Sequence, residues 1–95
     1  MRESIIEKHL VKRVKELGGE VRKVKWIGRT GAPDRVVMLP YKFMHATTTW
    51  VELKATGKEP TAGQMREHKK MRETGQRVIV FDSIEAIDKW LGFTP

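Results

Sequence analysis

The second half of the chain carries the pattern that constrains the fold most: a strand, a capped helix and a second strand in succession. Polar and apolar residues alternate over 49–55, which predicts a half-buried strand. Thr61 and Gln64 have the spacing of an N-terminal capping box, which predicts a helix over 61–74. Residues 77–81 contain a continuous apolar run, which is typical of a central strand covered on both faces. This succession predicts a parallel strand pair joined by a right-handed crossover.

The remaining sequence adds two helices and two strands to this unit. Apolar residues recur at spacings of four and three over 2–17, which predicts an amphipathic helix ended by a pair of glycines. Residues 20–27 and 35–39 predict short strands that are close enough in sequence to pair as antiparallel neighbours. Asp82 is the predicted cap of a last helix that closes at Gly92. We therefore predict an α/β fold of order α-β-β-β-α-β-α, with a mixed four-stranded sheet flanked by helices.

Length, charge and composition limit the classes of protein to consider. The 95 residues suffice for one domain, and no linker or repeat divides residues 1–95. The net charge of +7 indicates a polyanionic partner, with nucleic acid the first candidate and an anionic membrane surface the second. No apolar run is long enough to span a bilayer, and the predicted helices are too weakly amphipathic to lie at a membrane surface, so no membrane partner is expected. The absence of cysteine excludes disulfides and cysteine-ligated zinc and is typical of an intracellular, cytoplasmic protein.

Three charged residues form a candidate catalytic set. The period of two along a strand places the Glu52 and Lys54 side chains on one face, while Leu53 points to the core. A carboxylate there can bind a hard divalent cation, and the ammonium can hold an attacking water or a phosphate oxygen. Asp34 follows Pro33 at the mouth of a strand, so strand pairing would bring a second carboxylate beside Glu52. Either motif alone is common on solvated surfaces, whereas the combination favours a cation site with two acids.

The same residues resemble a known nuclease signature. A PD dipeptide at 33–34, followed by ELK at 52–54, is similar to the PD-(D/E)xK motif. The fuller strings GAPDR at 31–35 and VELK at 51–54, followed by Gln64 at the start of the next helix, resemble the VRR-NUC family of that superfamily. The resemblance covers nearly the whole chain, because the core of that family has the same order of elements. It implies a restriction-endonuclease-like fold and a metal-dependent DNA endonuclease.

The resemblance also implies a role for each matching residue. Asp34 and Glu52 would ligate Mg²⁺ or Mn²⁺, with the Leu53 carbonyl as a third protein ligand. Lys54 would position the attacking water and stabilise charge in the transition state. Glu7 matches the N-terminal acidic residue of the family and would complete the acidic pocket through water. A solvated glutamate on the first helix is an equally good interpretation of Glu7.

Basic residues and one glutamine complete the candidate site. Gln64 matches the glutamine of the family at the head of the second helix, a catalytic role that is compatible with its capping box. We predict phosphate contacts from the connectors and the second helix, by Arg29, Lys58, Arg66, Lys69 and Lys70. The alternative is that this helix simply presents a charged face to solvent. The three histidines have no spacing typical of metal ligands and receive no catalytic role.

The expected substrate is branched DNA, such as a four-way junction, because no base-reading motif is visible. A homodimer would bring two active sites to two strands, through Tyr41, Phe43 and Met44 or through the helix face around Ile5. The runner-up function is a non-catalytic basic module that binds nucleic acid. The acid pair disfavours this alternative, because two carboxylates would repel phosphate unless a cation intervened. A structural or protein-interaction domain would explain neither the charge nor the acids.

Overall fold

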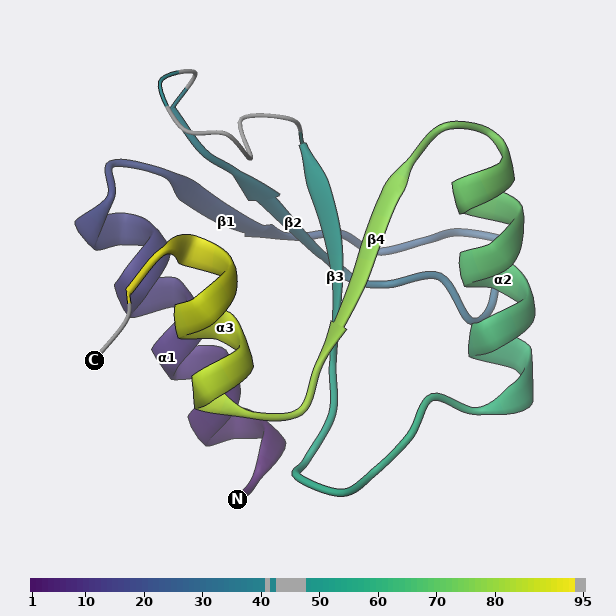
Figure 1. Ribbon diagram of the computed structural model, residues 1–95. Coiled ribbons are helices and arrows are strands. Elements are labelled where there is room, and N and C mark those ends of the chain that lie inside the picture. Colours follow the sequence, from purple (N-terminus) through teal and green to yellow (C-terminus); the bar gives the residue numbers. More distant parts are fainter. Residues whose placement is uncertain (41, 43–47, 94–95) are drawn as a thin grey trace.

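The computed structural model describes residues 1–40, 42 and 48–93. Within these residues the chain follows the predicted order of elements (Figure 1). They are α1 (Glu3–Glu16), β1 (Glu20–Lys23), β2 (Arg35–Met38), β3 (Thr49–Leu53), α2 (Ala62–Glu73), β4 (Arg77–Phe81) and α3 (Ile84–Leu91). The predicted α/β fold of order α-β-β-β-α-β-α is confirmed. None of the helices described is long and apolar enough to cross a membrane.

The four strands form one sheet in the order β1-β2-β3-β4. β2 pairs antiparallel with β1 and β3, whereas β3 and β4 are parallel, so the predicted meander and the predicted parallel pair are both confirmed. The predicted central position of strand 77–81 is wrong, because β4 is the last strand of the sheet. Helices α2 and α3 pack against β4 from opposite sides and bury Val78 and Phe81. This explains why a strand at the edge of the sheet has two apolar faces.

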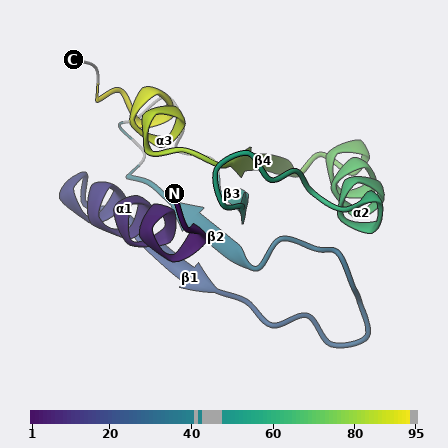
Figure 2. The same cartoon turned by 90° about the horizontal axis from the view of Figure 1, so that it is seen from below.

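Helices α1 and α3 pack together on one face of the sheet, and α2 lies on the other face (Figures 1 and 2). The apolar core lies between the sheet and α1 and α3, where Ile6, Leu10 and Val14 of α1 are fully buried at spacings of four. Val51 and Leu53 of β3 point into the same core, as the alternation predicts. The opposite face of β3 therefore turns its polar side chains toward α2.

The first predicted strand, 20–27, is wrong over its second half. β1 ends at Lys23, which pairs with Arg35, the first residue of β2. The chain before Arg35 turns around Pro33, which has no N–H to donate to a strand ladder. One further main-chain hydrogen bond, from the N–H of Val24 to the carbonyl of Asp34 (2.9 Å), follows the last ladder pair. The chain then leaves the sheet, and Ile27 is 93% exposed instead of lying on a sheet face.

The last helix has a different cap from the one predicted at Asp82. Ser83 is the N-cap, and its Oγ accepts a hydrogen bond from the N–H of Ala86 (3.1 Å). The Asp82 carboxylate accepts the N–H of Gly57 (3.3 Å) and so holds the connector before α2. Gly92 ends the helix as predicted, in the left-handed conformation with φ of 87°.

Candidate active site

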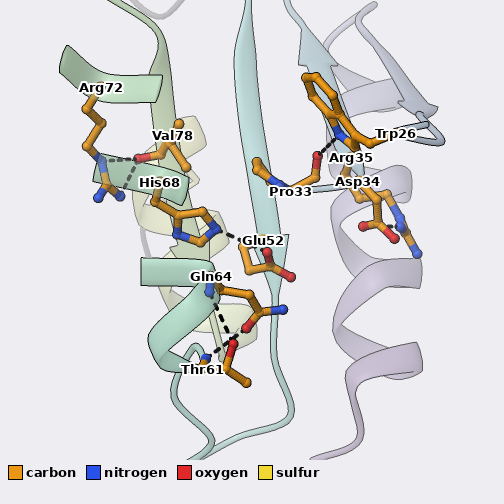
Figure 3. A network of polar contacts seen from close by, with 10 residues as sticks. All are labelled: Trp26, Pro33, Asp34, Arg35, Glu52, Thr61, Gln64, His68, Arg72 and Val78. Atoms are coloured by element: carbon orange, nitrogen blue, oxygen red, sulfur yellow. Dashed lines mark hydrogen bonds and ion pairs between the residues drawn. The ribbon is translucent and has the colours of Figure 1, made fainter. Parts of the chain in front are cut away.

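The strand register brings Asp34 and Glu52 together. Arg35 pairs with Val51 in the antiparallel β2–β3 ladder, and a step backward along β2 corresponds to a step forward along β3. Asp34, one residue before Arg35, therefore lies across from Glu52, one residue after Val51. Residues opposed in this way have Cβ atoms about 5 Å apart on one face of the sheet. Figure 3 shows both carboxylates at this end of the two strands.

Contacts to the sheet and to α2 hold the connector that carries Asp34. Gly31 has φ of +83°, and a Cβ atom there would lie 2.8 Å from the carbonyl oxygen of Gly63, so glycine permits this close approach to α2. Pro33 is buried, and its carbonyl accepts a hydrogen bond from the indole N–H of Trp26 (2.9 Å; Figure 3). The peptide group that precedes Asp34 is thus fixed in place before any ligand binds.

Arg35 links Asp34 to α1. Its Nη1 atom lies 2.6 Å from Oδ1 of Asp34, and its Nη2 atom forms an ion pair with Glu7. Burial lowers the pKa of Arg35, while the charges of Glu3 and Glu52 raise it. The guanidinium of Arg35 therefore connects Glu7 to Asp34. The role of Glu7 in the acidic pocket stays a prediction. The sequence pattern did not indicate that Arg35 would contact Asp34.

Glu52 is buried on the face of β3 that turns toward α2. Burial raises the pKa of its carboxyl from 4.5 to about 7. Lys54 lowers this pKa, whereas the negative charges of Asp34 and Glu3 raise it. The site therefore contains two mutually repelling acids and one nearby ammonium that partly offsets them.

His68 of α2 contacts Glu52 and is missed by the sequence analysis. Its Nε2 atom lies 3.1 Å from Oε1 of Glu52, and its side chain is 2% exposed (Figure 3). Burial and the nearby cations Arg72 and Lys54 lower the pKa of His68 below its ordinary 6.5, which favours the neutral ring. One signal could have identified it, because His68 follows Gln64 by four residues and so shares its helix face.

Gln64 and Leu53 have different surroundings within the same region. The capping box of α2 is confirmed: Gln64 Oε1 accepts the N–H of Thr61 (2.9 Å), and the N–H of Gln64 donates to Thr61 Oγ1 (3.1 Å). In Figure 3, Gln64 lies between this cap and Glu52. The Leu53 side chain is buried in the apolar core, so only its main-chain carbonyl could contact a cation.

The residues at the site fit a hard divalent cation. Mg²⁺ is commonly held by one or two carboxylates, with water and substrate phosphate in the remaining positions. Asp34 and Glu52 supply two carboxylates, and the raised pKa of Glu52 reflects a negative charge that its surroundings leave poorly compensated. Across residues 1–40, 42 and 48–93, no three His, Asp or Glu side chains gather where they could hold one metal ion. A cation here would therefore depend on the acid pair, a carbonyl and ligands from solvent or substrate.

The predicted DNA-binding residues separate into two sets. Arg29, Arg66 and Lys70 line one open hollow between the β1–β2 connector and α2. Lys58 lies in the turn after β3, and Lys69 lies elsewhere on α2; both are exposed and neither lines this hollow. Only the first set is brought together by the fold.

The chain is similar to known proteins over almost its whole length. A protein of Acyrthosiphon pisum secondary endosymbiont phage 1, named "Putative nuclease p44", is 46% identical over 83 residues, which are 87% of this chain and 85% of that protein. A solved structure described as a VRR_NUC domain matches with a TM-score of 0.81 and 35% identity, over 98% of this chain and 97% of that chain. No family profile matches the sequence. The similarity extends to the connectors as well as to the sheet and helices.

Proposed function

This chain belongs to the VRR-NUC family, and from that membership we propose that it is a nuclease that hydrolyses phosphodiester bonds in DNA with Mg²⁺ or Mn²⁺. In this proposal residues 1–95 act as one catalytic domain. The observation that carries it is the register that puts Asp34 opposite Glu52, with Lys54, directly after β3, close enough for its charge to lower the pKa of Glu52. A domain that only binds DNA gains nothing from two opposed carboxylates, because they repel phosphate when no cation is present.

Each side chain has its own task in the proposed reaction. Asp34 and Glu52 would hold the divalent cation, which when bound would supply Lewis-acid chemistry toward the attacking water and the phosphate. Lys54 orients the attacking water and offsets the negative charge that develops on the phosphate. His68 and Arg35 are positioning residues, since they contact Glu52 and Asp34 and not the reacting atoms.

A panel of DNA substrates with and without metal tests this function. We expect cleavage in Mg²⁺ or Mn²⁺ and none in excess EDTA, because the acid pair acts only through a cation. We expect flapped and four-way-junction DNA to be cut faster than linear duplex of the same sequence, because basic side chains contact phosphates and not base edges. Denaturing gels of end-labelled DNA measure both rates. Equal rates in EDTA and Mg²⁺ would exclude metal dependence, and equal rates on linear and branched DNA would exclude structure selectivity.

We further expect the active form to be a homodimer whose two sites act on two strands of a branched substrate. Ile5 on α1 is 47% exposed and offers an apolar contact, while Tyr41, Phe43 and Met44 lie outside the described residues. Light scattering at micromolar concentration should give twice the 11.0 kDa mass of the chain. Mixing wild type with excess Glu52→Gln protein should convert paired incisions on a junction into single nicks. A monomeric mass, with full paired cutting in that mixture, would contradict the expectation.

A further inference from the structure

A groove leads away from the acid pair along the β1–β2 connector. One hollow beside Asp34 is lined by Lys23, Lys25, Trp26 and Arg29. Arg29 also lines the hollow between the connector and α2, so the two hollows adjoin. We call their union the connector groove and define it by Lys23, Lys25, Trp26, Arg29, Arg66 and Lys70. The two lysines are absent from the DNA-binding residues that the sequence predicts.

The connector groove is strongly positive. Among the twelve residues that line the two hollows, five are Lys or Arg and two are acids. The carboxylates among its lining residues are Asp34, at the catalytic end, and Glu67, which accepts a hydrogen bond from Nη1 of Arg29 (3.2 Å). Glu67 is largely buried, whereas the Arg29 side chain remains 55% exposed. A positive surface with Asp34 at one end suits a phosphate chain whose scissile group lies at the acid pair.

Trp26 is the aromatic member of the groove, and its position beside Asp34 is fixed. Its indole N–H donates to the carbonyl of Pro33, the residue before Asp34 (2.9 Å). Its ring packs against Trp50 of β3, with centroids 5.2 Å apart and planes at 48°. The ring is half-buried and lines the hollow, so part of its surface stays accessible. An aromatic ring among cations suits an unpaired nucleotide, because its base can stack while its phosphates meet the charges.

We propose that the connector groove binds an unpaired DNA strand beside the scissile bond, with one base stacked on Trp26 and phosphates on Lys23, Lys25 and Arg29. The inference rests on the proposed nuclease function and, among branched substrates, favours DNA with a single-stranded arm, such as a flap, over a fully paired four-way junction. Since Trp26 is bonded to the residue before Asp34, the stacked base belongs to a nucleotide next to the scissile phosphate. A base inside a duplex is already stacked and cannot present its face to the ring.

Binding measured in EDTA separates this proposal from catalysis. The probes are three fluorescein-labelled DNAs: a duplex with an oligothymidine arm, the same duplex with an abasic arm of equal length, and the blunt duplex. The abasic arm keeps every phosphate and lacks every base. By fluorescence anisotropy we expect the thymidine arm to bind roughly 5- to 150-fold more tightly than the abasic arm, the range of base–aromatic stacking. Equal affinity for the two arms would overturn the stacked base, and equal affinity for armed and blunt duplexes would overturn the strand path.

Two substitutions of Trp26 isolate its ring. Trp26→Phe keeps an aromatic face, whereas Trp26→Leu removes it. Both variants lose the hydrogen bond from the indole N–H to the carbonyl of Pro33, so any effect of that loss on the backbone at Asp34 is common to both. We expect Trp26→Phe to retain the preference for the thymidine arm and Trp26→Leu to lose it. Loss in both variants, or retention in both, would overturn the assignment to Trp26. The wild-type comparison of the two arms uses no variant, and it decides the proposal even if Trp26→Leu does not fold.

A charge-matched pair of double variants tests the phosphate contacts. Lys23→Ala with Lys25→Ala removes two charges from the groove, and Lys15→Ala with Lys89→Ala removes two from exposed positions on α1 and α3. For the armed DNA, we expect the slope of log affinity against log salt to fall by about 1.4 in the groove variant, at roughly 0.7 per single-strand phosphate contact, and to stay unchanged in the helix variant. Equal changes would mean that net charge alone drives binding and would overturn the groove. Cleavage in Mg²⁺ is assayed separately, so a protein that binds the arm but never cuts would refute only the nuclease function.

Discussion

Substitution of Asp34 by Asn, Glu52 by Gln or Lys54 by Ala is expected to slow DNA cleavage by on the order of 10²- to 10³-fold or more, as when one preorganised charge-stabilising group is lost. Each change removes one charge from the site. Glu52→Gln keeps an oxygen that can accept a hydrogen bond from His68, so its loss of activity reports the missing charge and not a packing defect. Single-turnover cleavage of an end-labelled four-way junction in Mg²⁺ measures the rates.

Glu85→Gln is the matched control, because Glu85 is an exposed glutamate on α3, across the sheet from the acid pair. This variant should cut at the wild-type rate. Thermal unfolding should show that all four proteins are folded, and the Asp34→Asn protein should still bind DNA in the presence of metal. Wild-type cleavage by the Glu52→Gln or Lys54→Ala protein would show that the catalytic set is assigned wrongly.

The metal-free protein is expected to lose stability as the pH rises from about 4.5 to about 7, and Glu52→Gln should remove that loss. In the folded state the pKa of Glu52 is about 7, against an ordinary value of 4.5 that applies to the unfolded chain. Between these values the folded protein binds more protons than the unfolded one, so the free energy of unfolding falls as pH rises. The shift corresponds to on the order of 3 kcal/mol, fully expressed above pH 7.

His68 acts in the opposite direction, so the comparison must be between variant and wild type. Its folded pKa lies below 6.5, and its contribution to stability therefore grows as the pH rises toward that value. Urea unfolding of both proteins in EDTA across this pH range isolates the carboxyl of Glu52. A loss of stability as large in Glu52→Gln as in wild type would contradict the raised pKa.

Metal provides an independent readout of the same two acids. At pH 8, Mg²⁺ should raise the melting temperature of the wild-type protein, because a ligand that binds only the folded state stabilises it. The double variant Asp34→Asn with Glu52→Gln should lose this response. An equal response in the double variant would place the cation elsewhere on the protein.

Local patterns in the sequence determined the order of the elements and the face on which the acids lie. A period of two over residues 49–55 assigns Glu52 and Lys54 to the polar side of a strand, and spacings of four assign the buried stripe of α1. The capping box at Thr61 marks the start of α2 in the same way. These features can be predicted from the sequence because each depends on residues close together in the chain, within one strand or one or two turns of a helix. Asp34 joined the candidate set through its motif, and the β2–β3 register then explains its position.

Only the tertiary structure decided how far each strand pairs and which side chains meet across the chain. β1 ends at the residue that pairs with the first residue of β2. β4 is an edge strand, but helices cover both of its faces, so its apolar pattern is the same as that of a central strand. His68 reaches Glu52 across 16 positions, and Trp26 reaches both Pro33 and Trp50. Such contacts depend on the rotation of α2 about its axis and on the path of an irregular connector. The rotation of the helix and the path of the connector leave no periodic signal in the sequence. Packing between distant segments determines both, whereas the preferences of neighbouring residues do not.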